Sequence, residues 1–220
     1  MNRTRHAFRW IPARTIVAAS LLALLESAAP VQAGDPPAQA GTEAQAVRFE
    51  PRIGLDGRPV DLNAPTDGVS VLVFLSAECP ISNAYSPTLN ELAGAFAGGT
   101  FRMAGVYVDP DLSDAEVATH AREFALKFPT LRDPRSALAA RLGAKVTPEA
   151  FVLDARGRIC YHGRIDDQFA ARRKRNANTS THELRDAAEA VLAGVPVAAP
   201  YVEAVGCPIP DPTPAGPTPK

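Results

Sequence analysis

Apolar residues recur along the chain with two different spacings, which predict strands and helices in alternation. The nearly continuous apolar run at 69–75 predicts a central strand that is buried on both faces. Downstream, Leu89, Leu92 and Phe96 recur at helical spacing and predict a helix that ends at glycines 98 and 99. The other predicted elements are, in chain order, a hairpin of 47–53 and 59–62, a strand at 101–108, a helix that runs from a capping box at Ser113 to about residue 127, a helix at 136–142, strands at 150–153 and 158–165, and a helix at 181–194.

The order of these elements indicates the fold class. It reads β-β-α-β-α-α-β-β-α, so strands alternate with helices before a hairpin and a helix close the chain. Such an order predicts an α/β fold in which a mixed central sheet carries helices on both faces. We place this domain at residues 46–196.

The two ends of the chain differ from the middle. Four arginines precede an apolar run at 16–25, and small residues follow it at the spacing of a cleavage site, which predicts a secretory signal peptide at 1–33. The alternative is an uncleaved membrane anchor, but about 18 apolar residues are usually needed to span a bilayer. Residues 34–45 predict a disordered leader, and 197–220 form a Pro-rich tail that contains a cysteine. We therefore expect a protein exported to the periplasm or the extracellular space, with no stable membrane insertion after signal cleavage.

Charge and cysteine content narrow the function classes. The chain has 23 Lys+Arg against 24 Asp+Glu, so no charge excess indicates a nucleic-acid partner or an anionic membrane surface. The basic run at 171–178 is therefore interpreted as a solvated loop rather than a binding patch. Three cysteines are too few for a disulfide scaffold, and their odd number leaves at least one thiol without a partner in the chain.

Cys79 is the strongest candidate for chemistry. It follows the buried strand directly and precedes the next helix, so its sulfur is predicted to lie near a helix N-terminus, where a thiolate is stabilised. Pro80 suits the first turn of that helix, because its missing N–H is not needed there. The alternative is a buried, inert cysteine.

Two segments carry a resemblance to a known family. Residues 71–82, which end in Glu-Cys-Pro-Ile-Ser, and residues 146–154, which begin with Val-Thr-Pro-Glu, resemble the thioredoxin-like superfamily, in particular its redoxin, alkyl-hydroperoxide-reductase-like and TlpA-like branches. The resemblance spans 47–194 and implies a thioredoxin-like fold. It also implies that Pro148 is a cis-proline facing the nucleophile, preceded by Thr147.

The Cys79 motif departs from the family patterns in ways that bear on its chemistry. Glu78 stands where thioredoxins have tryptophan, and Ser82 stands where they have the second cysteine, so a local disulfide is impossible. Ser82 is either a hydrogen-bond donor to a thiolate or simply a residue of the first helical turn. Ser76 matches the Thr/Ser of the peroxiredoxin pattern, but Leu72 replaces its proline. A carboxylate of Glu78 directed at the sulfur would oppose thiolate formation.

The other two cysteines call for different interpretations. Cys207 lies in a Pro/Gly-rich segment and is the candidate resolving cysteine, because a mixed disulfide or sulfenic acid needs a second thiol. A permanent structural disulfide between Cys79 and Cys207 is the alternative. Cys160 lies within a predicted strand and is expected in the core.

The polar segment after that strand is expected to be structural. Arg164 is predicted to pair with Asp166 or Asp167 and so to order the loop.

These features predict an exported thiol–disulfide oxidoreductase in which Cys79 is the nucleophile and Cys207 resolves the intermediate. Its expected partners are a protein or small-molecule disulfide, or a peroxide, and a thiol electron donor, with no cofactor and no metal. One alternative is a peroxiredoxin-like peroxidase. Another is a copper-handling accessory protein that uses both thiols with His162 or His182. The third alternative is a redox-inert binding domain of the same fold.

Overall fold

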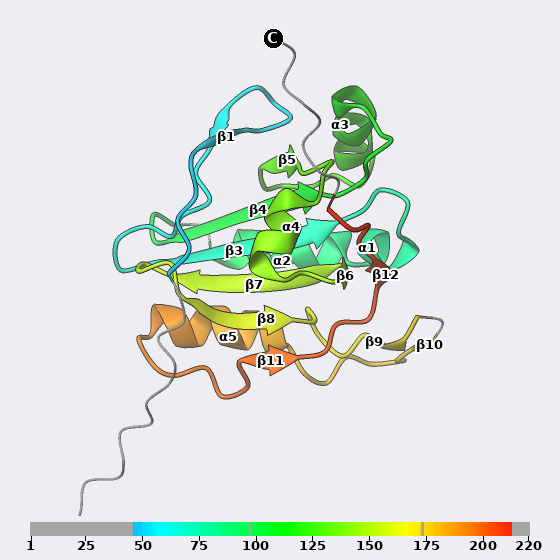
Figure 1. The fold of residues 1–220 in the computed structure, drawn as a ribbon. Helices are drawn as coiled ribbons and strands as arrows, with labels where there is room; N and C mark the ends of the chain where they lie inside the picture. Colours follow the sequence, from blue (N-terminus) through cyan, green and yellow to red (C-terminus); the bar gives the residue numbers. More distant parts are fainter. Residues whose placement is uncertain (1–45, 97, 173, 213–220) are drawn as a thin grey trace, which may run out of the picture. The chain divides into compact units, whose positions relative to one another are not determined.

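A six-stranded mixed sheet forms the centre of the computed structural model, which describes residues 46–96, 98–172 and 174–212 (Figure 1). The strand order is β11-β8-β7-β3-β4-β5. Strands β3, β4 and β5 are parallel to one another, β7 is antiparallel to β3 and β8, and β11 is parallel to β8. These strands are β3 (Val69–Leu75), β4 (Phe101–Tyr107), β5 (Thr130–Arg132), β7 (Glu149–Asp154), β8 (Ile159–Gly163) and β11 (Tyr201–Val202).

Helices cover both faces of this sheet, which confirms the predicted fold class. Alternate residues of β3 enter two separate cores, because successive side chains of a strand point to opposite faces. Val71 and Val73 face α1 (Pro80–Ala84), α2 (Ser86–Ala95), α3 (Asp114–Glu123) and α5 (Glu183–Leu192), whereas Leu72 and Phe74 face α4 (Ala137–Leu142) and the N-terminal hairpin.

Three short ladders lie outside the central sheet. They are β1 (Arg52–Ile53) with β2 (Pro59–Val60), β9 (Phe169–Ala171) with β10 (Lys174–Arg175), and β6 (Val146–Thr147) with β12 (Cys207–Pro208). All three pairs are antiparallel. The segment after residue 196 thus supplies both β11 and β12, so it completes the domain rather than following it as a separate tail.

Each predicted helix is present in the structure, but some helices differ from the prediction in their ends or their continuity. Ser113 forms the predicted capping box with Glu116 at the start of α3. The single helix expected after Cys79 is two helices, α1 and α2, with Tyr85 between them. Pro87 explains the interruption, since a proline inside a helix removes one backbone hydrogen bond and clashes with the preceding turn. Strand β5 was not predicted, because its three residues are too short to show a period.

The predicted signal peptide at 1–33 and leader at 34–45 lie outside the described residues, as do residues 213–220. Within the part of the chain that the structure describes, no helix is long and apolar enough to cross a membrane.

Candidate functional site

Cys79 lies at the carboxyl edge of the sheet, between β3 and α1. It is the N-cap residue of α1, and Pro80 occupies the first helical position, where a proline costs no hydrogen bond. Its backbone N–H donates to the carbonyl of Ser76 at 3.2 Å, and its carbonyl accepts from the N–H of Asn83 at 3.0 Å. The side chain is only 1% exposed, so the sulfur is covered by its surroundings.

The ladder of β6 and β12 brings Thr147 and Cys207, two further residues of the predicted site, close to Cys79. The Thr147–Pro148 peptide bond is cis, and Thr147 stands opposite Cys207 in the ladder. The Cys79 thiol donates to the Thr147 carbonyl at 3.0 Å, while the Thr147 hydroxyl donates to the Cys207 carbonyl at 3.4 Å. Thr147, which lies 68 positions after Cys79 in the sequence, thus contacts its thiol. Cys207 of β12 packs against the core cluster that contains Cys79.

The environments of the two sulfurs push their pKa values in opposite directions. Burial by itself raises the pKa of Cys79, but hydrogen bonds from the Cys207 thiol, the Ser82 backbone N–H and Thr147 outweigh it and hold the pKa below the ordinary thiol value. Burial and the adjacent Cys79 raise the pKa of Cys207, which Arg172 only partly offsets. All three cysteines are free thiols in this structure, and the opposite shifts mean that Cys79 loses its proton more readily than Cys207.

Ser82 contacts Cys79 through its backbone rather than its hydroxyl. Its side chain is 3% exposed, and its Oγ accepts from the Ser76 backbone N–H at 3.4 Å. The N–H of Ser82, rather than its hydroxyl, is among the groups that lower the pKa of Cys79. Glu78, next to Cys79, is exposed, and its carboxylate is not among the groups that shift the pKa of the thiol.

A hydrogen-bond network that sequence reasoning missed holds the loop before Cys79. Asp109, 6% exposed, accepts from the Ser76 hydroxyl at 2.6 Å and from the Ala77 N–H at 3.0 Å. The Asn83 side chain donates to the Ala77 carbonyl at 3.0 Å and lies 3.0 Å from His120 Nε2. A signal for Asp109 was present, because it follows β4, and parallel strands end at the same sheet edge.

The structure corrects the expectation for Cys160. A bulge between Val152 and Leu153 of β7 shifts the β7–β8 register, and Tyr161 and Ile159, but not Cys160, pair across it. Cys160 is half-buried and belongs to neither core cluster, so the predicted core position is wrong. Burial and the Asp154 carboxylate raise the pKa of its thiol.

The expected partner of Arg164 is also wrong. Arg164 forms an ion pair with Glu183 at the start of α5, not with Asp166 or Asp167. Asp166 instead accepts from the Tyr85 hydroxyl at 2.7 Å, and Asp167 accepts from the backbone N–H of Ser180 at 2.8 Å. Each of the three charged side chains therefore has a structural partner from a different part of the chain.

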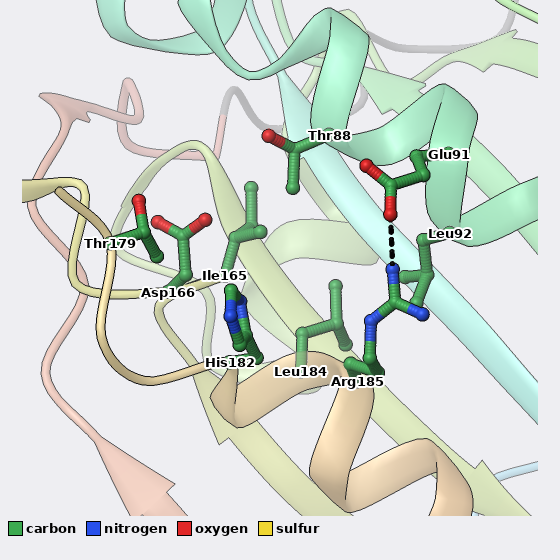
Figure 2. A pocket seen from close by; sticks show the side chains of 9 residues that line it. All are labelled: Thr88, Glu91, Leu92, Ile165, Asp166, Thr179, His182, Leu184 and Arg185. Carbon is green, nitrogen blue, oxygen red and sulfur yellow. Dashed lines mark hydrogen bonds and ion pairs between the residues drawn. The ribbon is translucent and has the colours of Figure 1, made fainter.

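The two histidines of the copper alternative lie in other surroundings. The ring of His162 lies between the rings of Phe151, on which it stacks, and Tyr201, which is tilted against it, with centroid distances of 5.5 and 4.6 Å. His182 lines a hollow of about 130 Å³ between α2 and α5, whose walls are polar and apolar in equal measure (Figure 2). Among residues 46–96, 98–172 and 174–212, no three or more His, Cys, Asp or Glu side chains gather as a metal site would require.

Comparisons with known proteins identify the family and similar folds. Residues 41–162, more than half of the chain, match the model of the AhpC/TSA family. A hypothetical protein from Sinorhizobium meliloti 1021 is 25% identical, with a TM-score of 0.62 over 74% of this chain and 92% of that one. An uncharacterized conserved protein from Geobacillus kaustophilus is 23% identical, with a TM-score of 0.63 over 78% and 93% of the two chains. No curated protein matches the sequence.

Proposed function

We propose that this chain, which belongs to the AhpC/TSA family of thioredoxin-like redox proteins, is a thiol–disulfide oxidoreductase that cycles a disulfide between Cys79 and Cys207. Membership of the family supports an oxidoreductase or peroxidase activity. The observation that supports the finer proposal is the β6–β12 ladder, which sets Cys207 opposite Thr147, the residue whose carbonyl accepts from the Cys79 thiol at 3.0 Å.

The two pKa shifts are consistent with a cycle of two exchange steps. The Cys79 thiolate attacks one sulfur of a substrate disulfide, forms a mixed disulfide and releases the first substrate thiolate. Cys207 then loses its proton and attacks the Cys79 sulfur, which forms the internal disulfide and releases the second substrate thiolate. A low pKa suits Cys79 both as attacking thiolate and, in the reverse direction, as leaving group. The Ser82 N–H and the Thr147 side chain lower the pKa of Cys79 and so favour its thiolate, whereas the Thr147 carbonyl loses its hydrogen bond when the thiol ionises.

A three-variant assay of insulin reduction by dithiothreitol tests the proposal. Cys79→Ser should abolish the catalysed rate, and Cys207→Ser should lower it strongly while trapping a mixed disulfide on Cys79. Cys160→Ser is the matched control, because Cys160 lies outside the site and its pKa is raised. Unchanged turnover in Cys79→Ser would sink the proposal.

The family also supports a peroxidase as a second candidate, in which peroxide oxidises Cys79 to a sulfenic acid and Cys207 condenses with it to release water. One feature separates the two functions. The hydroxyl of Ser76, which matches the peroxiredoxin pattern, donates to Asp109 at 2.6 Å rather than to the Cys79 sulfur. Stopped-flow decay of hydrogen peroxide with wild type and Cys79→Ser distinguishes them, since the oxidoreductase is expected to consume peroxide slowly.

Export to the periplasm or extracellular space is proposed on the sequence of residues 1–33. Fractionation of cells that express the full chain, with N-terminal sequencing of the product, tests it. A mature protein that begins at residue 34 is the expected result, and an intact N-terminus in the cytoplasm would contradict it.

A further inference from the structure

The β9–β10 hairpin places an exposed basic surface next to the more accessible of the two site cysteines. Arg172, Lys174 and Arg175 are all exposed. None of these three side chains forms an ion pair with any residue that the structure describes. Three uncompensated cations on one short hairpin are notable in a chain whose formal net charge is −1.

The hairpin reaches the redox pair directly. One guanidinium nitrogen of Arg172 lies 3.9 Å from the Cys207 sulfur. Figure 1 shows β9 and β10 near the same, right-hand end of the sheet as β12 and α1, which carry the site. The basic run that the sequence led us to interpret as a solvated loop is therefore connected to the chemistry by a contact that local sequence could not show.

Exposure decides which sulfur a partner meets first when the pair is oxidised. In this structure, where both are free thiols, Cys79 is 1% exposed, whereas Cys207 is half-buried and borders the hairpin. A thiol–disulfide exchange begins with attack by an external thiolate on an accessible sulfur, and the thiol of lower pKa leaves more readily. Both conditions favour attack on Cys207 with Cys79 as the leaving group.

We propose that the basic hairpin of Arg172, Lys174 and Arg175 docks a polypeptide partner whose reducing cysteine is flanked by acidic residues, and that this partner attacks the disulfide at Cys207. This inference rests on the proposed Cys79–Cys207 redox cycle. Cations on an exposed hairpin suit an acidic polypeptide surface, and opposite charges raise association rates when they lie within a screening length of each other.

The electrons balance in two exchanges. The partner thiolate bonds to the Cys207 sulfur, the bond between Cys207 and Cys79 breaks, and Cys79 leaves as a thiolate. A second partner thiolate attacks the partner sulfur of this mixed disulfide and releases Cys207, which takes up a proton. Two partner thiols are oxidised to one disulfide, and one protein disulfide is reduced to two thiols.

The probe is a pair of synthetic peptides that each carry one reduced cysteine, flanked by aspartates in one and by lysines in the other. Each peptide is mixed with the oxidised full-length protein, and the second-order rate constant of reduction is measured. We expect the acidic peptide to react roughly tenfold faster than its basic twin at low salt, and the difference to vanish near ~1 M salt, where the Debye length is about 3 Å.

Charge-reversal variants locate the effect on the hairpin. Lys174→Glu with Arg175→Glu should remove the preference for the acidic peptide, while Arg172 is left in place because it contacts the Cys207 sulfur. The matched control is Lys127→Glu with Arg156→Glu, which makes the same charge change at two exposed residues that have no ion pair with any described residue. That variant should keep the preference.

Reduction by dithiothreitol, which is uncharged, distinguishes failure of the docking inference from failure of the proposed redox cycle. If dithiothreitol reduces the oxidised protein at equal rates in both variants but the two peptides also react equally, the docking inference is overturned and the redox cycle stands. If dithiothreitol finds no internal disulfide to reduce, the proposed function fails and the docking inference falls with it.

Discussion

Replacing Gly206 with alanine should loosen strand β12 and uncover Cys79. Gly206 is buried immediately before Cys207, and its backbone passes very close to that of Thr147. A Cβ atom built on Gly206 would lie 2.3 Å from the Thr147 carbonyl oxygen and 2.7 Å from its carbonyl carbon. Both are backbone atoms, so no rotamer change relieves the clash.

The size of the effect follows from this geometry. Real Cβ contacts essentially never fall below 3.0 Å, so the two backbones must separate by about 0.7 Å. Overpacking of this kind costs about 1–3 kcal/mol. The β6–β12 ladder is only two residues long and is the weakest structure at the clash, so the strain is relieved by its opening. An opening made easier by 1–3 kcal/mol is populated roughly 5- to 150-fold more often.

The assay is the rate at which an alkylating reagent modifies Cys79 in the reduced protein, followed by mass spectrometry. It is run about one pH unit above the ordinary thiol pKa of ~8.5, so that the rate reports exposure rather than ionisation. Gly94→Ala is the matched control, because Gly94 is exposed on α2 and its added Cβ meets nothing within 4 Å. An equal rate of Cys79 modification in the two variants would refute the idea that β12 covers the thiol.

Two further predictions address charge at and beyond the site. Cys207→Ala should raise the pKa of Cys79, because it removes the thiol that donates to the thiolate, whereas the hydroxyl of Cys207→Ser should preserve part of the pKa lowering. Thiolate absorbance measured against pH checks this prediction. An unchanged pKa in Cys207→Ala would contradict it. Burial by itself raises the pKa of Glu183, but hydrogen bonds from Arg164 and Thr181 hold this pKa below its ordinary value. The ionised carboxylate therefore stabilises the fold at pH values above its unfolded pKa of ~4.3, and this contribution is lost as the pH falls through the folded pKa. Arg164→Met should therefore cost about 1–3 kcal/mol of unfolding free energy near neutral pH and progressively less as the pH falls below ~4.3, as measured by urea denaturation. A loss that does not change with pH would count against the ion pair.

The features of the fold that were predicted correctly are those with a local signal. The apolar run of β3 needs no distant partner to be recognised, and the capping box at Ser113 is complete within four residues. The position of Cys79 between strand and helix follows directly from these signals.

The features that were missed depend on contacts between distant segments. Strands β11 and β12 have two residues each, so neither shows a period, and both form by pairing with strands far away in the sequence. Arg164 was assigned to nearby carboxylates, but α5 supplies Glu183 from 19 residues away. Cys160 was misplaced because a bulge, which has no sequence signal here, breaks the alternation of its strand.

The central claim is that Cys79 and Cys207 form the redox pair, and disulfide mapping tests it most directly. The full chain is oxidised mildly, the remaining thiols are blocked, and the digested protein is mapped by mass spectrometry before and after treatment with dithiothreitol. The expected result is an intramolecular disulfide between Cys79 and Cys207 that dithiothreitol reverses, with Cys160 recovered in the blocked form. A disulfide that contains Cys160, or the recovery of Cys79 and Cys207 both unlinked, would contradict the claim.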